Sequence, residues 1–214
     1  MKKLAVMAAV CIAVATVLII SGRPAVAAKL GLFQHHKDIG IAPKHGAARF
    51  DKKADEYFVT GGGANMWASA DAFQFVYRQI SGDVVLTADI RFEGQGVEAH
   101  RKAALMIRQS LASDSAYADA AVHGSGLTSL QYRPSKGAIT LETRSEIEAP
   151  TQVRIERRGD QFTMWAGKTG GELKSAGPVT VHLQDPVYIG LAVCSHNASV
   201  LETALFSNLK LERP

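Results

Sequence analysis

The stretch SAYADAAVHGSGLTSLQYR, at positions 115–133, combines charged, amide and aromatic side chains at a spacing of two residues. Successive side chains of a strand point to opposite faces of a sheet. One face therefore carries Tyr117, Asp119 and His123 before the glycine-containing turn, and Gln131 and Arg133 share a face after it. Such a row is typical either of a solvated outer face or of a surface that binds a polar ligand.

The candidate ligand-binding set extends this row with charged residues on both sides of it. Its members are Arg108, Tyr117, Asp119, His123, Gln131, Arg133, Glu142 and Arg144. Their polar groups donate and accept hydrogen bonds in fixed directions, and a phenol ring adds a flat apolar surface. The alternative is a solvated face laced with cross-strand ion pairs between arginine and carboxylate side chains. Spacing alone does not place all eight on one face, because the register across the turns is unknown.

The segments that must position these side chains alternate as strands do. Residues 84–92, VVLTADIRF, are the clearest example, because apolar side chains occupy every second position. We expect one face, with Val84, Leu86, Ala88, Ile90 and Phe92, to be buried, and Thr87, Asp89 and Arg91 on the other face to be less so.

Turn-punctuated runs elsewhere predict further strands. They are DEYFVT (55–60) before a glycine turn, FQFVYRQI (73–80), ITLETR (139–144), the hairpin TQVRIERRGDQFTMWAG (151–167) turning at Gly159 and Asp160, VTVHL (179–183), VYIGLAVCSH (187–196) and ALFSNLKLER (204–213). Many short strands of this kind indicate an all-β sandwich or barrel. The segment 100–121 also shows a partial helical stripe, so periodicity leaves strand and helix open there.

Several long motifs resemble the concanavalin A-like, laminin-G-like jelly-roll domains of secreted bacterial proteins. They are GGGANMW (61–67), FVYRQISGDVVLTADIRF (75–92), HRKAALMIRQSL (100–111), the stretch 115–133 and ETALFSNLKL (202–211). The resemblance covers nearly all of residues 31–212. It implies a two-sheet antiparallel jelly-roll sandwich that occupies residues 28–214 as a single domain, with KAALMIRQ and AYADAAVHG as adjacent strands.

The function that we expect is that of a non-catalytic, lectin-like module whose outer sheet face binds carbohydrate. A structural or protein-interaction module is the first alternative, and a glycoside hydrolase is the second, since one superfold hosts many activities. Glucanases of this superfold carry a Glu-x-Asp-x-x-Glu run, which this sequence lacks. Asp119 and Glu142 could form a carboxylate pair, although an ion pair with Arg108, Arg133 or Arg144 is the simpler use. We therefore predict no catalytic residue.

Two tryptophans are further candidates for stacking on a sugar ring. Trp67 follows the glycine run and either forms such a platform or packs in the core or at the rim of the sandwich. Trp165 lies in the predicted hairpin, and we expect it to be the more exposed of the two.

Metal ligands have less support in the sequence. His35 and His36 are adjacent and would point to opposite faces of a strand, and the other histidines lack the spacing of a zinc site. The resemblance makes a structural calcium ion at the rim conceivable, with Asp38 or Asp185 as contributors. We assign no metal site and no other cofactor.

Residues 1–27 are typical of a secretory signal peptide. Two lysines precede an apolar run from Leu4 to Ile20, and the small residues AVA at 25–27 form a cleavage signal after Ala27. An uncleaved membrane anchor is the alternative. We expect an exported domain, periplasmic or extracellular, with no membrane span after cleavage and with a glycan or an envelope protein as partner.

The charge of the chain depends on this segment. The formal net charge of +4 includes Lys2, Lys3 and Arg23, so residues 28–214 carry 21 basic and 20 acidic side chains. Nucleic-acid binding needs a clustered basic surface and is not expected. Cys194 is the one cysteine after residue 27, which excludes an intrachain disulfide. Its apolar surroundings predict a buried, reduced thiol.

Overall fold

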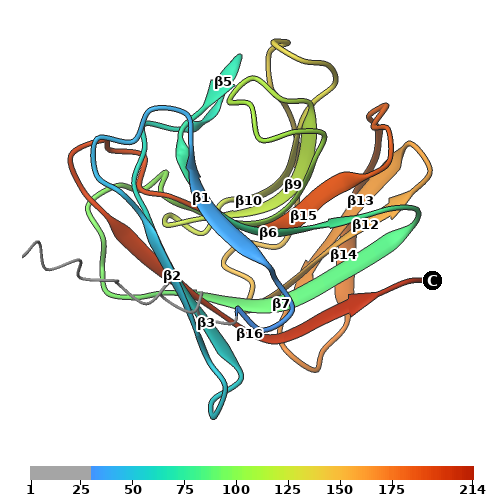
Figure 1. Cartoon of the computed structure of the whole chain (residues 1–214). Coiled ribbons are helices and arrows are strands. Elements are labelled where there is room, and N and C mark those ends of the chain that lie inside the picture. Colours follow the sequence, from blue (N-terminus) through green and yellow to red (C-terminus); the bar gives the residue numbers. More distant parts are fainter. Residues whose placement is uncertain (1–29) are drawn as a thin grey trace, which may run out of the picture.

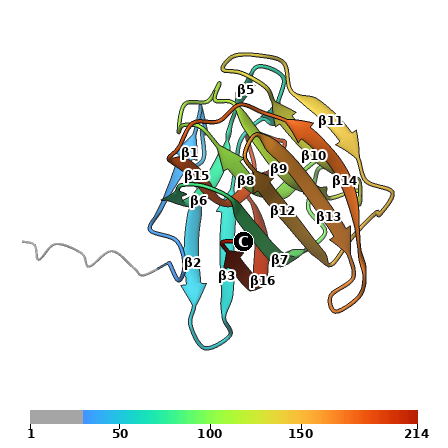
Figure 2. The same ribbon diagram turned by 90° about the vertical axis from the view of Figure 1, so that its right-hand side faces the viewer.

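The computed structural model describes residues 30–214. The predicted signal peptide and its cleavage site lie outside the described residues. Every strand pairing in the described part is antiparallel, and the strands form two seven-stranded sheets and one short two-stranded ribbon. Figures 1 and 2 show the two sheets stacked as a sandwich, with the C-terminus on the second sheet.

The strand order of each sheet is far from the order of the sequence. The first sheet contains β1 (His35–Ile39), β6 (Phe73–Ile80), β15 (Val187–Cys194), β8 (Lys102–Arg108), β9 (Tyr117–His123), β10 (Thr128–Arg133) and β11 (Leu141–Arg144). The second contains β14 (Leu173–Thr180), β13 (Gln161–Gly167), β12 (Gln152–Arg158), β7 (Val84–Phe92), β16 (Glu202–Glu212), β3 (Glu56–Gly61) and β2 (Ala47–Asp51). The ribbon pairs β4 (Met66–Trp67) with β5 (Ala70–Asp71).

The main hydrophobic core lies between the two sheets. Strand β7 contributes the face that the sequence predicts, with Val84, Leu86, Ala88 and Ile90 buried and Phe92 packed against them. Arg91 is exposed and Asp89 is partly exposed, as expected. Thr87 is buried on the outer face because it lies beside Arg154 of β12, whose Nε donates to its hydroxyl at 3.2 Å.

Most predicted strands are confirmed. β6 and the hairpin of β12 and β13 agree with the predicted segments, and residues 102–123 form strands β8 and β9 and no helix. The prediction of a strand at 179–183 is wrong, because β14 pairs with β13 earlier in the chain, at Leu173–Thr180. Strands β1 and β2 were not predicted, since their short polar segments show no alternation.

The first sheet is buried on both of its faces over much of its width. Its outer face carries a second apolar cluster from β6, β15, β8 and β9, which includes Phe73, Phe75 and Met106. Met66 of the ribbon belongs to this cluster as well, so the ribbon covers part of the sheet. This cover explains why β6, β8 and β9 show continuous burial rather than alternation.

Within residues 30–214, no helix of the length and apolarity that a membrane crossing requires is found.

Candidate functional site

The strand register places all eight predicted site residues on the outer face of the first sheet. Directly paired residues point to the same face. One cross-strand row joins Asp119, Gln131 and Glu142, and another joins Arg108, Tyr117 and Arg133. Lys102 pairs with His123, and Ser129 pairs with Arg144, on the same face. The register that the sequence left open therefore brings the set together.

Six of the eight predicted residues are buried, and four of these are completely closed off from solvent. Arg108, Tyr117, Asp119 and Arg133 are each 0% exposed. The β4–β5 ribbon and the loop that follows β8 supply backbone and side-chain partners for the two arginines. From the row of polar residues we expected Tyr117, His123, Gln131 and Arg133 to be exposed beside Arg108. That prediction is wrong, because all of them are buried, and Arg108 and Arg133 hold the covering segments in place.

Arg133 is the main anchor of this cover. Its guanidinium makes two hydrogen bonds to the Asp71 carboxylate, of 2.6 and 2.8 Å. It also donates to the carbonyl of Ala68, in the turn of the ribbon, and to that of Ser115, in the loop after β8. Arg108 lies 3.5 Å from the same carboxylate and donates to the carbonyls of Ser110 and Ala112. Burial, the largest influence, raises the pKa of Asp71, while the hydrogen bond from Arg133 and both guanidinium charges act in the opposite direction.

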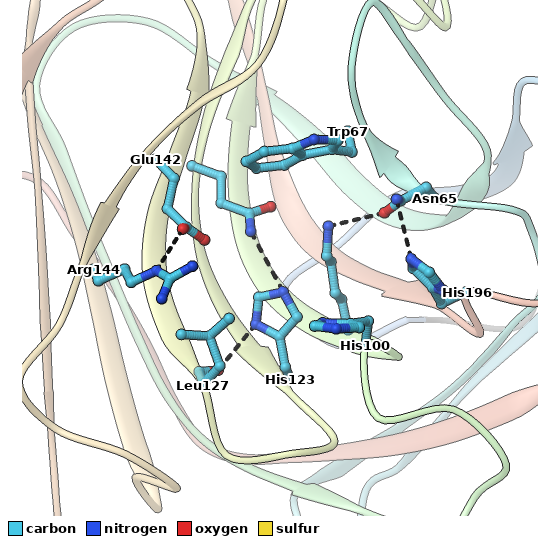
Figure 3. A pocket seen from close by; sticks show the side chains of 10 residues that line it. Asn65, Trp67, His100, His123, Leu127, Glu142, Arg144 and His196 are labelled. Atoms are coloured by element: carbon cyan, nitrogen blue, oxygen red, sulfur yellow. Dashed lines mark hydrogen bonds and ion pairs between the residues drawn. The ribbon is translucent and has the colours of Figure 1, made fainter.

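The other four residues of the set line an open pocket of about 230 Å³. Its predicted members are His123, Gln131, Glu142 and Arg144. Sequence reasoning did not place the remaining lining residues there, which are Asn65, Trp67, His100, Lys102, Leu127 and His196. In Figure 3 the indole of Trp67 lies across one end of the pocket, between Glu142 on one side and Asn65 on the other.

Some of these additional residues could have been found from the sequence. Lys102 lies an even number of residues before Arg108 on the same strand, so the spacing of two places it on the same face as the predicted row. Trp67 was itself considered as a surface on which a sugar ring could stack. His100 and His196 precede and follow strands that are distant in the sequence, so no local pattern links them. Their rings lie with centroids 5.6 Å apart, and His100 is 5.9 Å from His123.

His123 and Gln131 form the polar floor of the pocket. His123 is 4% exposed, and its Nδ1 donates to the Leu127 carbonyl at 2.9 Å. Burial, with the nearby charge of Lys102, lowers the His123 pKa to about 4, so the ring is neutral at pH 7 and its Nε2 is an acceptor. Gln131 Nε2 lies 3.5 Å from that acceptor, while Gln131 Oε1 has no hydrogen-bond partner among the described residues.

Asp119 lies beside this floor on the same face of the sheet, between Met106 of β8 and Gln131 of β10. Neither of its carboxyl oxygens has a hydrogen-bond partner within the described chain, and burial raises its pKa to about 8. Within residues 30–214 no arginine forms an ion pair with Asp119, so the arginine–carboxylate pair considered for it in the sequence is not observed. Glu142 does form the expected pair, since it accepts from Arg144 Nε at 2.8 Å.

Trp67 also borders a neighbouring, more apolar pocket of about 370 Å³ with Ile41, Ala68 and Ala70. The indole is half-buried, and Lys102 Nζ lies 5.3 Å from its ring centroid. Trp165 is half-buried as well, on the outer face of the second sheet beside Arg154. The two tryptophans thus have similar surroundings on opposite sheets, but Trp67 is the one that faces the polar pocket.

The acidic residues considered for calcium are engaged within the chain. Asp38 accepts from the Gly46 amide and lies 3.0 Å from His45, and Asp185 accepts from the Gly82 amide and pairs with Arg157. Over residues 30–214, no group of three or more histidine, cysteine or acidic side chains is arranged to hold a metal ion.

Cys194 is buried, as predicted. It is 0% exposed, its thiol donates to the Gly63 carbonyl at 3.5 Å, and it is the free cysteine of the described chain. Burial raises its pKa to about 11. Such a thiol packs as a small apolar side chain.

No family model and no curated protein matches the sequence. Solved structures do match. A functionally unknown protein from Saccharomyces cerevisiae aligns with a TM-score of 0.60 at 10% identity, over 78% of this chain and 92% of that one. The carbohydrate-binding module CBM66 from Bacillus subtilis aligns with a TM-score of 0.51 at 13% identity, over 85% and 97% of the two chains.

A GH43 protein from Bacillus licheniformis aligns with a TM-score of 0.56 at 9% identity, over 84% of this chain and 39% of that one. Likeness at these identities shows the fold alone. Membership in a family of secreted bacterial proteins therefore stays a prediction, whereas the two-sheet architecture is confirmed. The chain folds as a concanavalin A-like, antiparallel jelly-roll sandwich.

Proposed function

We propose that this protein is a carbohydrate-binding module and that its sugar site is the pocket beside Trp67. The observation that carries the proposal is a half-buried indole next to a floor of buried, planar polar side chains, one of which has an unpartnered oxygen. A sugar ring has an apolar face of C–H groups and an edge of hydroxyls. It therefore needs an aromatic surface and several fixed hydrogen-bonding groups at once.

The polar groups of the pocket complement hydroxyl groups. Gln131 Oε1 lacks a donor, and the neutral His123 ring presents an acceptor nitrogen near it. Buried polar atoms without partners are rare in proteins. Because Gln131 Oε1 is itself buried, its amide must turn toward the pocket to meet a ligand hydroxyl, and that hydrogen bond would hold the sugar ring against Trp67.

The likeness to a carbohydrate-binding module agrees with this proposal only at the level of the fold. Neither alternative function has a specific feature in its favour. The two carboxyls considered for hydrolysis are separated by β10. Only Glu142 lines the pocket, and Asp119 is completely buried. Export of the domain through residues 1–27 is part of the proposal, and sequencing the N-terminus of the protein recovered from its host would test cleavage after Ala27.

A glycan array probed with residues 28–214, followed by calorimetry on the sugars that bind, tests the proposal. We expect Trp67→Ala to weaken binding about tenfold or more, because the stacking surface is lost. We expect Gln131→Met to weaken it as well, since a thioether of similar size makes much weaker hydrogen bonds than the amide.

The matched control is Trp165→Ala, which removes an equally half-buried tryptophan beside a cation on the other sheet. It should leave the affinity unchanged. Binding that survives Trp67→Ala in a folded protein would place the site elsewhere, and an array without any bound glycan would overturn the proposed function.

A further inference from the structure

The pocket contains a buried cation with no ion-pair partner. Lys102 is 3% exposed, and its ammonium donates to two neutral oxygens, Asn65 Oδ1 and the Met66 carbonyl, each at 2.9 Å. No carboxylate of the described chain lies within ion-pair distance of it. Buried lysines are rare unless they are paired. The third N–H of the ammonium has no hydrogen-bond acceptor among the described residues.

Burial lowers the pKa of Lys102, and the nearby carboxyls, Asp119 first among them, act in the opposite direction without forming an ion pair with it. The one acidic residue that lines the pocket, Glu142, is already bound to Arg144. Asp119 is the buried carboxyl with the largest influence on Lys102, and burial favours its protonated form by raising its pKa to about 8. The indole of Trp67 faces the cation from 5.3 Å, but a cation–π contact is weaker than a charge-assisted hydrogen bond.

Asn65, His123 and His196 supply further hydrogen-bonding groups around the cation. His100, His123 and His196 surround the pocket, and burial lowers the pKa of both His123 and His196. Asn65 joins Lys102 to His196, because its amide accepts from the ammonium and its Nδ2 lies 3.2 Å from His196 Nε2. An anion entering here would meet one buried positive charge and several neutral polar groups.

We infer that the ligand of this pocket is an acidic sugar, whose carboxylate or sulfate binds Lys102 while its ring stacks on Trp67. This inference rests on the proposed carbohydrate-binding function and narrows it to one chemical class. A neutral sugar would leave the Lys102 charge uncompensated, whereas an acidic one would pair with a cation that is buried from solvent, where such pairs are stronger than at the surface.

The test is an array of matched glycan pairs that differ only in charge: uronic-acid oligosaccharides and their methyl esters, sulfated chains and their desulfated forms, and sialylated glycans before and after desialylation. The expected result is binding of acidic members and at least a tenfold loss on neutralisation. Their affinity should also fall as sodium chloride rises, because salt screens the attraction. Neutral members that bind as well as their acidic counterparts would overturn the inference and leave the proposed function intact. An array with no bound glycan would overturn both.

Two variants that change the charge of the pocket in opposite directions provide a second test. Lys102→Met should weaken binding of the acidic glycan at least tenfold. Glu142→Gln should strengthen it several-fold, because the one carboxylate lining the pocket is removed. Arg154→Gln, which removes the cation beside Trp165 on the other sheet, should change nothing. If Lys102→Met does not fold, Glu142→Gln decides alone, and a loss of acidic-glycan affinity in that variant would contradict the inference.

Discussion

Arg133 and Asp71 form a bidentate ion pair in which both side chains are completely buried, with N···O distances of 2.6 and 2.8 Å. The pair joins strand β10 to the β4–β5 ribbon across 62 residues of sequence. Because Trp67 lies on that ribbon, the ion pair also fixes the edge of the pocket.

Arg133→Gln should therefore lower the free energy of unfolding by about 3–5 kcal/mol, since it leaves the Asp71 carboxylate buried without its main partner. Chemical denaturation followed by tryptophan fluorescence measures this change. The control is Arg144→Gln, which removes a largely exposed guanidinium from its pair with Glu142 and should have a much smaller effect on stability. Equal stability of both variants would contradict the anchoring role.

The sequence predicts the sandwich well because period-two alternation is a local property. Strand β7 shows it clearly, since its two faces meet different surroundings, the core and the exterior. In β8 and β9 both faces are buried, so alternation disappears and periodicity could not separate strand from helix. The resemblance to a known fold resolved that segment.

Only part of the site could be predicted, because the polarity of a strand does not show which other segments cover its outer face. The spacing of Tyr117 and Arg133 correctly places them on one face, but their burial depends on Asp71, a contact across 62 residues. His196 enters the pocket from the segment after β15 and shares no local pattern with His123. Contacts between distant segments therefore decide which polar residues a ligand can reach.

Gly63, in the glycine run before the β4–β5 ribbon, occupies a backbone position that a residue with a side chain could not adopt without displacing its neighbours. Its φ is +108°, and a Cβ there would lie 1.9 Å from the Ala72 carbonyl oxygen. Gly63→Ala should reduce stability and weaken glycan binding, because the ribbon that carries Trp67 must move. Gly170→Ala is the matched control, since Gly170 has φ of +75° but open space around its Cβ position. It should show the backbone strain alone, with a smaller loss of stability and unchanged binding.

Cys194 should react slowly with a thiol reagent in the native protein. The side chain is completely buried, and its pKa of about 11 keeps the thiolate population small at pH 8. Labelling should become fast once denaturant unfolds the domain. A native labelling rate close to that of the unfolded chain would show that the segment around β15 opens readily.

The buried carboxyl of Asp119 should make stability depend on pH. Burial raises its pKa in the folded state to about 8, above the ordinary value of 3.8, so the folded protein binds the proton more tightly than the unfolded chain does. The favourable contribution is fully present below pH 4 and is lost as the pH rises to about 8. Charges on Lys102, Asp71 and Arg133 also act on this group, and His123 titrates nearby.

Asp119→Asn isolates this contribution, because the neighbouring groups titrate in both proteins and largely cancel in the difference. The free energy of unfolding of the variant, relative to wild type, should increase steadily between pH 4 and pH 8. Denaturant unfolding at several pH values measures it, with Glu148→Gln, at an exposed acidic residue, as the control whose difference stays flat. A difference that is constant over this range, or that decreases as the pH rises, would show that Asp119 is ionised in the folded protein at neutral pH. In that case Lys102 would already have its counter-charge in Asp119, and the argument for an acidic sugar would lose its basis.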